Sequence, residues 1–184
     1  IQAGIVKPDI VVDAKSGVSG AGRGKYPFAD TNENLMAYSV TGHRHMPEIK
    51  QELNKLDDSV DLNITFLTHL VPMNRGLLAS CYAPINYEKV SGSDINSQIS
   101  TIYEDFYGKE LFVQISDSAP MTKNTLGTNN CMILPTVDLR SNRLIVVSCI
   151  DNLIKGAAGQ AIQNMNLMFG LPEDMGLNGL ALYP

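Results

Sequence analysis

Short runs of β-branched and apolar residues recur along this chain, and two helical stretches interrupt them. Residues 60–66 alternate apolar and polar side chains with the period of a half-buried strand, and residues 77–85 form a second apolar run. Residues 132–139 and 144–150 flank a polar turn and predict a hairpin. Strands that arrive in pairs with helices between them predict an α+β domain with a mostly antiparallel or mixed sheet. Helices on one face of that sheet leave the other face free to pair with another subunit.

Three shorter runs complete the predicted sheet, at residues 10–14, 35–40 and 111–115. A long turn at residues 70–76 separates the strand at 60–66 from the strand at 77–85. We expect these two strands to pair with each other in antiparallel fashion across that turn.

Two helices are predicted between the strands. The first begins at Pro47, because the missing N–H of proline costs nothing in a first helical turn. We expect Ser91 or Ser93 to cap the second helix and Gly108 to end it. The apolar stripes of the two helices are Ile49, Leu53 and Leu56, and Ile95, Ile99, Ile102 and Phe106. A last helix is predicted within residues 152–170, and its small-residue entry permits close approach by a backbone or a flat ligand.

Length, charge and cysteine usage limit the class of protein. A chain of 184 residues, 44% of them hydrophobic, suits one domain over residues 1–184. The net charge of −5 argues against nonspecific nucleic-acid binding, and no apolar run reaches the length of a membrane span. Cys81, Cys131 and Cys149 are scattered singly, which predicts structural thiols, no zinc site and a cytoplasmic location. Because Ile1 is neither an initiator methionine nor part of a signal sequence, we expect an excised domain.

The densest group of titratable side chains lies immediately before the first helix, where the sequence reads Gly-His-Arg-His-Met-Pro-Glu-Ile over residues 42–49. A helix N-terminus offers unpaired N–H groups and a positive dipole end. His43, Arg44 and His45 at that position can therefore hold an anion and move a proton. Histidines two residues apart on a surface are also often incidental, so spacing alone leaves both interpretations open.

A glycine-rich loop at residues 15–24 follows the first predicted strand. Its main-chain N–H groups, the hydroxyls of Ser16 and Ser19 and the guanidinium of Arg23 could together bind a phosphate or carboxylate. The loop lacks the spacing of a P-loop or a dinucleotide fingerprint, so a flexible turn explains it equally well. Arg75, in the later turn, is either a solvated arginine or another anion ligand.

Four stretches in this order closely resemble N-acetyl-γ-glutamyl-phosphate reductases: residues 16–23, 42–49, 70–76 and 150–161. Aspartate-semialdehyde dehydrogenases share the Lys-Gly-Ala-Ala entry of the last helix but not the His-Arg-His-x-Pro-Glu-Ile loop, so this loop distinguishes the two families. The resemblance implies a C-terminal domain like that of glyceraldehyde-3-phosphate dehydrogenase. It covers the second half of such an enzyme, because the dinucleotide-binding domain and the nucleophilic cysteine are expected upstream of Ile1.

The resemblance implies NADPH-dependent reduction of N-acetyl-γ-glutamyl phosphate to N-acetylglutamate 5-semialdehyde, a step of arginine biosynthesis. We expect a homo-oligomer, an isolated chain without activity, and a helix over residues 152–170 that contacts the cofactor domain. His43 matches the acid–base histidine, while Gly156, Gly159 and Gln160 face the nicotinamide of NADP. The expected substrate ligands are Ser16, Ser19, Arg23, Arg44, His45 and Arg75. The alternatives are an aspartate-semialdehyde-dehydrogenase-like domain and a non-catalytic module for anion binding or oligomerisation.

Overall fold

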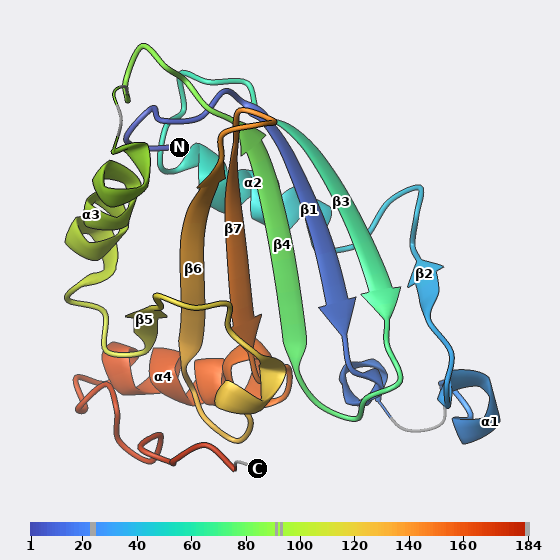
Figure 1. Cartoon of the computed structure of the whole chain (residues 1–184). Coiled ribbons are helices and arrows are strands. Elements are labelled where there is room, and N and C mark those ends of the chain that lie inside the picture. The colour runs from blue at the N-terminus through green and yellow to red at the C-terminus, as the bar shows by residue number, and fades with distance from the viewer. Residues whose placement is uncertain (23–24, 91, 93, 183–184) are drawn as a thin grey trace.

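The computed structural model describes residues 1–22, 25–90, 92 and 94–182. Within that part of the chain, seven strands form one sheet in the order β2-β3-β1-β4-β7-β6-β5 (Figure 1). The strands are β1 (Asp9–Ser16), β2 (Met36–Tyr38), β3 (Asn63–Leu70), β4 (Leu77–Pro84), β5 (Val113–Ile115), β6 (Cys131–Asp138) and β7 (Arg143–Ile150). The strands predicted from apolar runs and alternation are confirmed, although β3 covers Asn63–Leu70 instead of residues 60–66.

The sheet is mixed, as expected, but one predicted pairing is wrong. β1 runs parallel to β3 and β5 runs parallel to β6, whereas the other neighbours are antiparallel. β3 and β4 do not pair with each other, because β1 lies between them and pairs with both. The connection over residues 71–76 is long enough to pass across the end of β1. Alternation along a strand reports which face is buried, but it does not report which strand lies alongside.

Two helices cover one face of the sheet. α2 (Met46–Asn54) lies behind β1, β3 and β4 in Figure 1, and α3 (Ile95–Tyr107) lies beside β6. The core under α2 contains Ile10, Leu62 and Ala83, and the core under α3 contains Ile85, Ile95, Ile99 and Leu144. The N-cap of α3 is Asp94, whose side chain accepts a hydrogen bond from the N–H of Ser97. Ser91 and Ser93, the predicted caps, lie outside the described residues.

An apolar groove of about 680 Å³ lies between α2, α3 and this face of the sheet. Its lining includes Val12 and Cys81 from the sheet, Leu53 from α2 and Ile102 from α3. The three cysteines lie in strands, Cys149 is buried, and burial raises the pKa of all three thiols. The sequence-based assignment of these cysteines as structural thiols is therefore confirmed.

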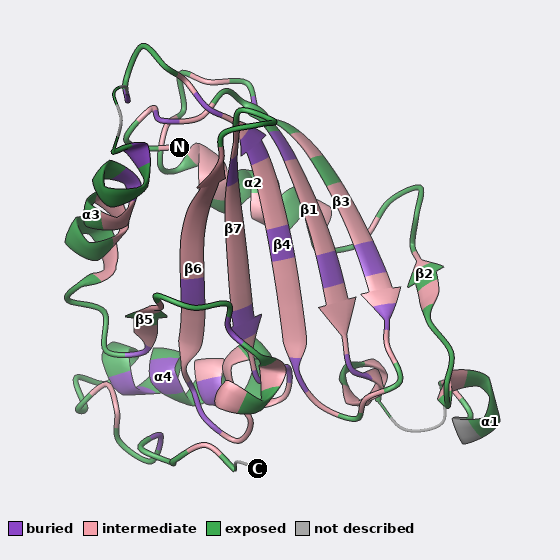
Figure 2. Cartoon of the chain, in the orientation of Figure 1, coloured by how far each residue is buried: buried purple, intermediate pink, exposed green. Residues whose placement is uncertain are grey.

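The opposite face of the sheet carries neither α2 nor α3, and the loop after β5 crosses its lower part in Figure 1. Asp13 on this face contacts Lys15 at 2.7 Å and His69 at 3.0 Å. Below the sheet, the chain forms a π-helical turn over Ile154–Ala158 and then α4 (Gly159–Met168), which confirms the predicted last helix. Gly159, Gln163 and Asn166 are the buried residues of α4. Figure 2 shows buried, purple segments on this helix. In the described part of the chain, no helix is long and apolar enough to cross a membrane.

Candidate active site

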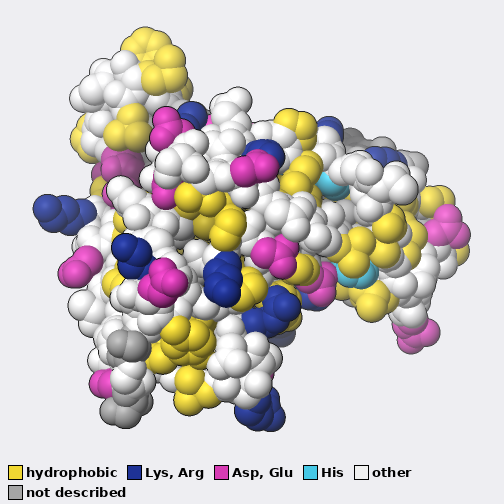
Figure 3. Space-filling view, turned by 90° about the horizontal axis from the view of Figure 1, so that it is seen from above, with side chains coloured by type: hydrophobic (Ala, Val, Ile, Leu, Met, Phe, Trp, Pro, Cys, Tyr) yellow, Lys and Arg dark blue, Asp and Glu magenta, His cyan; other side chains and the backbone are white. Residues whose placement is uncertain are grey.

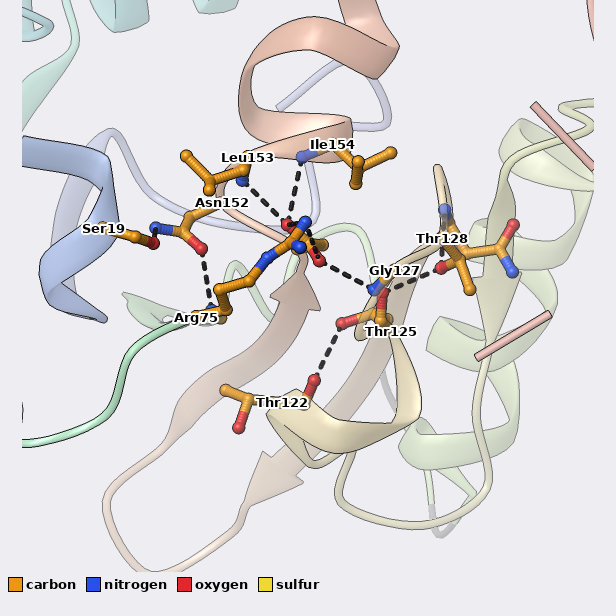
Figure 4. Close-up of polar contacts among 12 residues, drawn as sticks. Ser19, Arg75, Thr122, Thr125, Gly127, Thr128, Asn152, Leu153 and Ile154 are labelled. Carbon is orange, nitrogen blue, oxygen red and sulfur yellow. Dashed lines mark hydrogen bonds and ion pairs between the residues drawn. The ribbon is translucent and has the colours of Figure 1, made fainter. Parts of the chain in front are cut away.

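Asp151, directly after β7, is the centre of a buried polar cluster that joins loops from distant parts of the chain. Figure 4 labels its partners Arg75, Gly127, Leu153 and Ile154. Its carboxylate has no exposed surface and lies 2.8 Å from the guanidinium of Arg75. It also accepts hydrogen bonds from the main-chain N–H groups of Gly127 at 2.7 Å, Leu153 at 2.8 Å and Ile154 at 3.0 Å. Burial alone would raise the pKa of Asp151, but these donors outweigh burial and hold the pKa below its usual value.

Asn152, the next residue, bridges two further loops with its side-chain amide. Its Oδ1 accepts the N–H of Gly76 at 2.8 Å, and its Nδ2 donates to the hydroxyl oxygen of Ser19 at 3.0 Å. Sequence reasoning missed both Asp151 and Asn152. The signal that could have found them is two polar residues between an apolar strand and a helix start, where chain ends gather at one edge of a sheet.

The glycine-rich loop is packed against the turn over residues 71–76 and is not a free turn. It contains a short 3₁₀ helix over Val18–Ala21. The N–H of Gly17 donates to Gly76 O at 2.9 Å, and the N–H of Ser19 donates to Asn74 O at 3.1 Å. A Cβ on Gly17 would lie 2.7 Å from that Asn74 oxygen, so only glycine permits this approach. These N–H groups are therefore not available to an anion, which corrects the expectation of a main-chain cradle at these positions.

The predicted anion ligands differ in whether their side chains already have partners within the chain. Ser16 donates its hydroxyl hydrogen to Gly17 O at 3.1 Å, and Arg75 is held by Asp151 instead of being a solvated turn arginine. Arg44 is exposed. Arg23, the remaining predicted arginine, lies outside the described residues.

His43 lies on the helix-covered side of the sheet, in the loop before α2. Its ring packs edge-on against Phe66 of β3, with centroids 5.2 Å apart, and against Tyr38 of β2 at 5.6 Å. The ring of His45 lies 4.8 Å away. Seen from above, the histidine side chains in view lie toward the side of the molecule that carries β2 (Figure 3).

The protonation of His43 follows from its hydrogen bond and its neighbours. The main-chain N–H of His45 donates to Nδ1 of His43 at 3.1 Å, so the neutral imidazole carries its hydrogen on Nε2. Partial burial lowers the pKa of His43, and the positive charges of His45, Arg44 and Lys25 lower it further. At neutral pH His43 therefore presents an Nε2–H donor without a positive charge.

The two glycines of the small-residue entry to α4 differ in exposure. Gly156 is exposed, and the nearest atom to a Cβ built there is Ile150 Cδ1 at 3.4 Å. Gly159 is buried, and a Cβ there would clash with Asn129 Oδ1, so packing within the chain already explains this glycine. Gln160 donates to Asn164 along the helix at 3.0 Å.

The structure brings the candidate residues together in two groups. Ser19, Arg75 and the turn that contains Gly156 contact Asp151 or Asn152, and Ser16 lies at the start of the same loop as Ser19. Arg44 and His45 adjoin His43. Among the described residues, no hydrogen bond, ion pair or ring contact joins the two groups. In the same part of the chain, no group of three or more His, Cys, Asp or Glu side chains could hold a metal ion.

A family model described as "Semialdehyde dehydrogenase, dimerisation domain" matches residues 1–152 of this chain. A curated N-acetyl-gamma-glutamyl-phosphate reductase from Dehalococcoides mccartyi is 49% identical and covers 98% of this chain and 52% of its own length. The reductase of that name from Geobacter metallireducens is also 49% identical, over 95% of this chain and 51% of its own length. The chain thus spans about half the length of these curated relatives.

Two solved structures share the fold. Aspartate semialdehyde dehydrogenase II from Vibrio cholerae aligns with a TM-score of 0.66 and 15% identity, over 90% of this chain and 56% of its own. A probable aspartate-semialdehyde dehydrogenase from Pseudomonas aeruginosa aligns with a TM-score of 0.67 and 16% identity, over 91% and 57%. These likenesses confirm the predicted α+β architecture of the semialdehyde-dehydrogenase type.

Proposed function

The chain belongs to the semialdehyde dehydrogenase family through its dimerisation domain, and from this premise we propose that it is the substrate-binding and acid–base half of an N-acetyl-γ-glutamyl-phosphate reductase. The reaction reduces the acyl phosphate to N-acetylglutamate 5-semialdehyde in the cytoplasm, within arginine biosynthesis. The observation that carries the proposal is the neutral Nε2–H donor of His43. It occurs in a chain that resembles reductases of this name over nearly its whole length.

His43 is the proposed proton donor and acceptor. Reduction of an acyl group places negative charge on the carbonyl oxygen, and a positioned N–H donor stabilises that charge. The lowered pKa keeps His43 neutral near pH 7, so its Nε2–H can donate without the cost of burying an extra cation. The edge contacts with Phe66 and Tyr38 orient the ring.

The substrate carries a phosphate and a carboxylate, and we assign its recognition to side chains at both groups. Arg44 and His45 are exposed next to His43 and can pair with one anionic end. For the other anionic end, Ser19 offers a hydroxyl donor and Arg75 a guanidinium, and Ser16 in the same loop completes the proposed set. Arg23 belongs to the proposed ligand set on the resemblance of the glycine-rich loop alone.

NADP fits one part of the small-residue turn better than the other. Gly156 is exposed and leaves room for a flat ring, and Gln160 lies one turn further along. Gly159 is closed off by Asn129, so it supports the shape of the turn instead of contacting a ring. Bound NADPH supplies the hydride; the residues of this chain hold the substrate and the proton.

Exposed apolar side chains indicate where the rest of the enzyme packs. Met168 and Phe169, at the end of α4, are 82% and 75% exposed. Apolar side chains this exposed are expected to be covered by another part of the assembly. We assign the surface of residues 152–170 to the enzyme's own dinucleotide-binding half, and the sheet face without helices to a second copy of this domain.

Assays with two acyl phosphates and a binding measurement with inorganic phosphate test the proposal. The 184-residue chain alone should not reduce any acyl phosphate, whereas the polypeptide that joins it to a dinucleotide-binding half should oxidise NADPH with N-acetyl-γ-glutamyl phosphate. Turnover of β-aspartyl phosphate instead would reassign the substrate to the aspartate-semialdehyde branch. No turnover with either substrate, although inorganic phosphate still binds, would favour a non-catalytic anion-binding module.

A further inference from the structure

The side chain of Asn152 lies between the turn that contains Gly76 and the loop that contains Ser19 (Figure 4). We propose that Asn152 is a positioning residue that aims the hydroxyl hydrogen of Ser19 at an anionic group of the substrate. This inference rests on the proposed function and adds a residue that the family resemblance did not assign.

The orientation of the Asn152 amide is determined by its partners. The main-chain N–H of Gly76 can only donate, so the Asn152 atom 2.8 Å away must be the carbonyl oxygen. The amide nitrogen therefore faces Ser19, 3.0 Å from its Oγ. Asn152 is buried, and the adjacent Asp151 is anchored by Arg75 and by main-chain donors, so the amide cannot easily rotate away.

The hydroxyl groups of the two serines in the loop consequently have opposite hydrogen-bonding roles. Ser16 donates its hydroxyl hydrogen to the carbonyl oxygen of Gly17. Ser19 accepts from Asn152, which occupies a lone pair and leaves its own hydrogen free to point elsewhere. Among the described residues, Ser19 Oγ donates no hydrogen bond, and its side chain is partly exposed. Ser19 is therefore the serine that can donate to a ligand.

The main chain of the loop cannot replace that donor at these positions. The N–H groups of Gly17, Val18 and Ser19 donate to carbonyl oxygens of the turn over residues 71–76. A Cβ on Gly20 would lie 3.2 Å from the Asn152 amide nitrogen, so a side chain there would press on the amide. The absence of bulk at Gly20 preserves the link between Asn152 and Ser19.

Asn152→Asp tests the role of the amide because it keeps the shape of the side chain and replaces the donating NH2 group with a negatively charged, accepting oxygen. The carboxylate can still accept from Gly76, but it cannot donate to Ser19 and instead accepts the Ser19 hydrogen, turning that hydrogen away from the ligand. In the joined, active reductase we expect KM for the acyl phosphate and Ki for inorganic phosphate to rise about 10- to 100-fold, with kcat nearly unchanged. Asn142→Asp is the matched control, because Asn142 is exposed at the β6–β7 turn and keeps its acceptor role toward Tyr87.

A double-mutant cycle separates positioning from general structural support. Ser19→Ala alone should raise KM to a similar extent. Adding Asn152→Asp to it should cause only the small further rise that the new carboxylate charge produces, because Asn152 acts through Ser19. Multiplicative effects in the double variant would overturn the proposal, since Asn152 would then act through the Gly76 turn. An unchanged KM in Ser19→Ala would overturn it even if Asn152→Asp does not fold. A wild-type enzyme that turns over no acyl phosphate would instead contradict the proposed function.

Discussion

The two groups of candidate site residues are held in opposite ways. Asp151 is fully buried and accepts four donors, which come from Arg75, Gly127, Leu153 and Ile154. His43 is only partly buried, and one main-chain N–H and the edges of neighbouring rings hold it. Charge-assisted hydrogen bonds are worth about 1.5–3 kcal/mol each, whereas aromatic edge contacts are worth about 0.5–1.5 kcal/mol.

This difference distinguishes residues that stabilise the fold from residues proposed to take part in the reaction. The Asp151 carboxylate is preorganised by this chain alone, because all of its donors come from this chain. The His43 loop leaves the imidazole accessible, so its final geometry depends on the substrate and on whatever part of the enzyme covers it. Replacement of Asp151 should therefore mainly change stability, and replacement of His43 should mainly change turnover.

Replacement of His43 should produce the largest effect. In the joined reductase, His43→Asn should lower kcat by about 10²- to 10⁴-fold with KM nearly unchanged, because the proton donor is lost while the size of the side chain is roughly kept. Steady-state NADPH oxidation measures both constants, and thermal unfolding should show no large loss of stability. Wild-type turnover in this variant would remove His43 from the chemistry and would erase the contrast between the two groups.

Replacement of Asp151 should mainly cost stability. Asp151→Asn leaves Arg75 without its counter-ion and turns an amide hydrogen toward main-chain donors, so the free energy of unfolding should fall by about 3 kcal/mol. This value is at the low end for a buried pair because the Arg75 side chain is 28% exposed. Urea unfolding of the 184-residue chain measures the change.

The matched control for Asp151 is Asp61→Asn. Asp61 also pairs with a cation, Lys50, but its side chain is 96% exposed, so its loss should leave unfolding unchanged within error. Equal stability of the Asp151→Asn and Asp61→Asn chains would show that the buried cluster is not the scaffold described above.

Replacement of His45 should have a smaller effect than replacement of His43. As a proposed substrate ligand, His45 contacts ground state and transition state alike, so His45→Asn should raise KM about 3- to 10-fold and leave kcat within about twofold. A large loss of kcat, paired with normal turnover in His43→Asn, would exchange the roles of the two histidines.

The smallest expected effect is a change in the titration of His43. NMR titration of the labelled 184-residue chain should give a pKa below 6.5, because burial and the charges of His45, Arg44 and Lys25 disfavour the protonated ring. His45→Asn removes one of these charges and should raise the pKa of His43.

The sign of the pH dependence follows from this depressed pKa. The contribution of His43 to stability and activity is present above 6.5 and is lost as pH falls through the lowered pKa. A measured pKa at or above 6.5 would show that the ring is freely solvated and that the His43 loop is even less organised than described.

Local patterns predicted much of the fold. The alternation of residues 60–66 and the polar turn before residue 144 indicated strands that the structure contains. Pro47 and the spacing of Ile49 and Leu53 indicated α2. The same residues did not indicate that β1 separates β3 from β4, because a period of two is the same whichever strand lies beside it.

The sequence by itself determined the elements, the candidate histidines and the small-residue entry to α4, since each is written in neighbouring residues. Only the tertiary structure decided which candidate side chains already have hydrogen-bond or ion-pair partners within the chain. Arg75 and Asp151 are 76 residues apart in the chain, and Ser19 and Asn152 are 133 apart, so no local pattern could show that they are partners. Such contacts form only when the sheet brings the ends of β1, β3 and β7 together, and burial at that edge then favours polar groups that find partners.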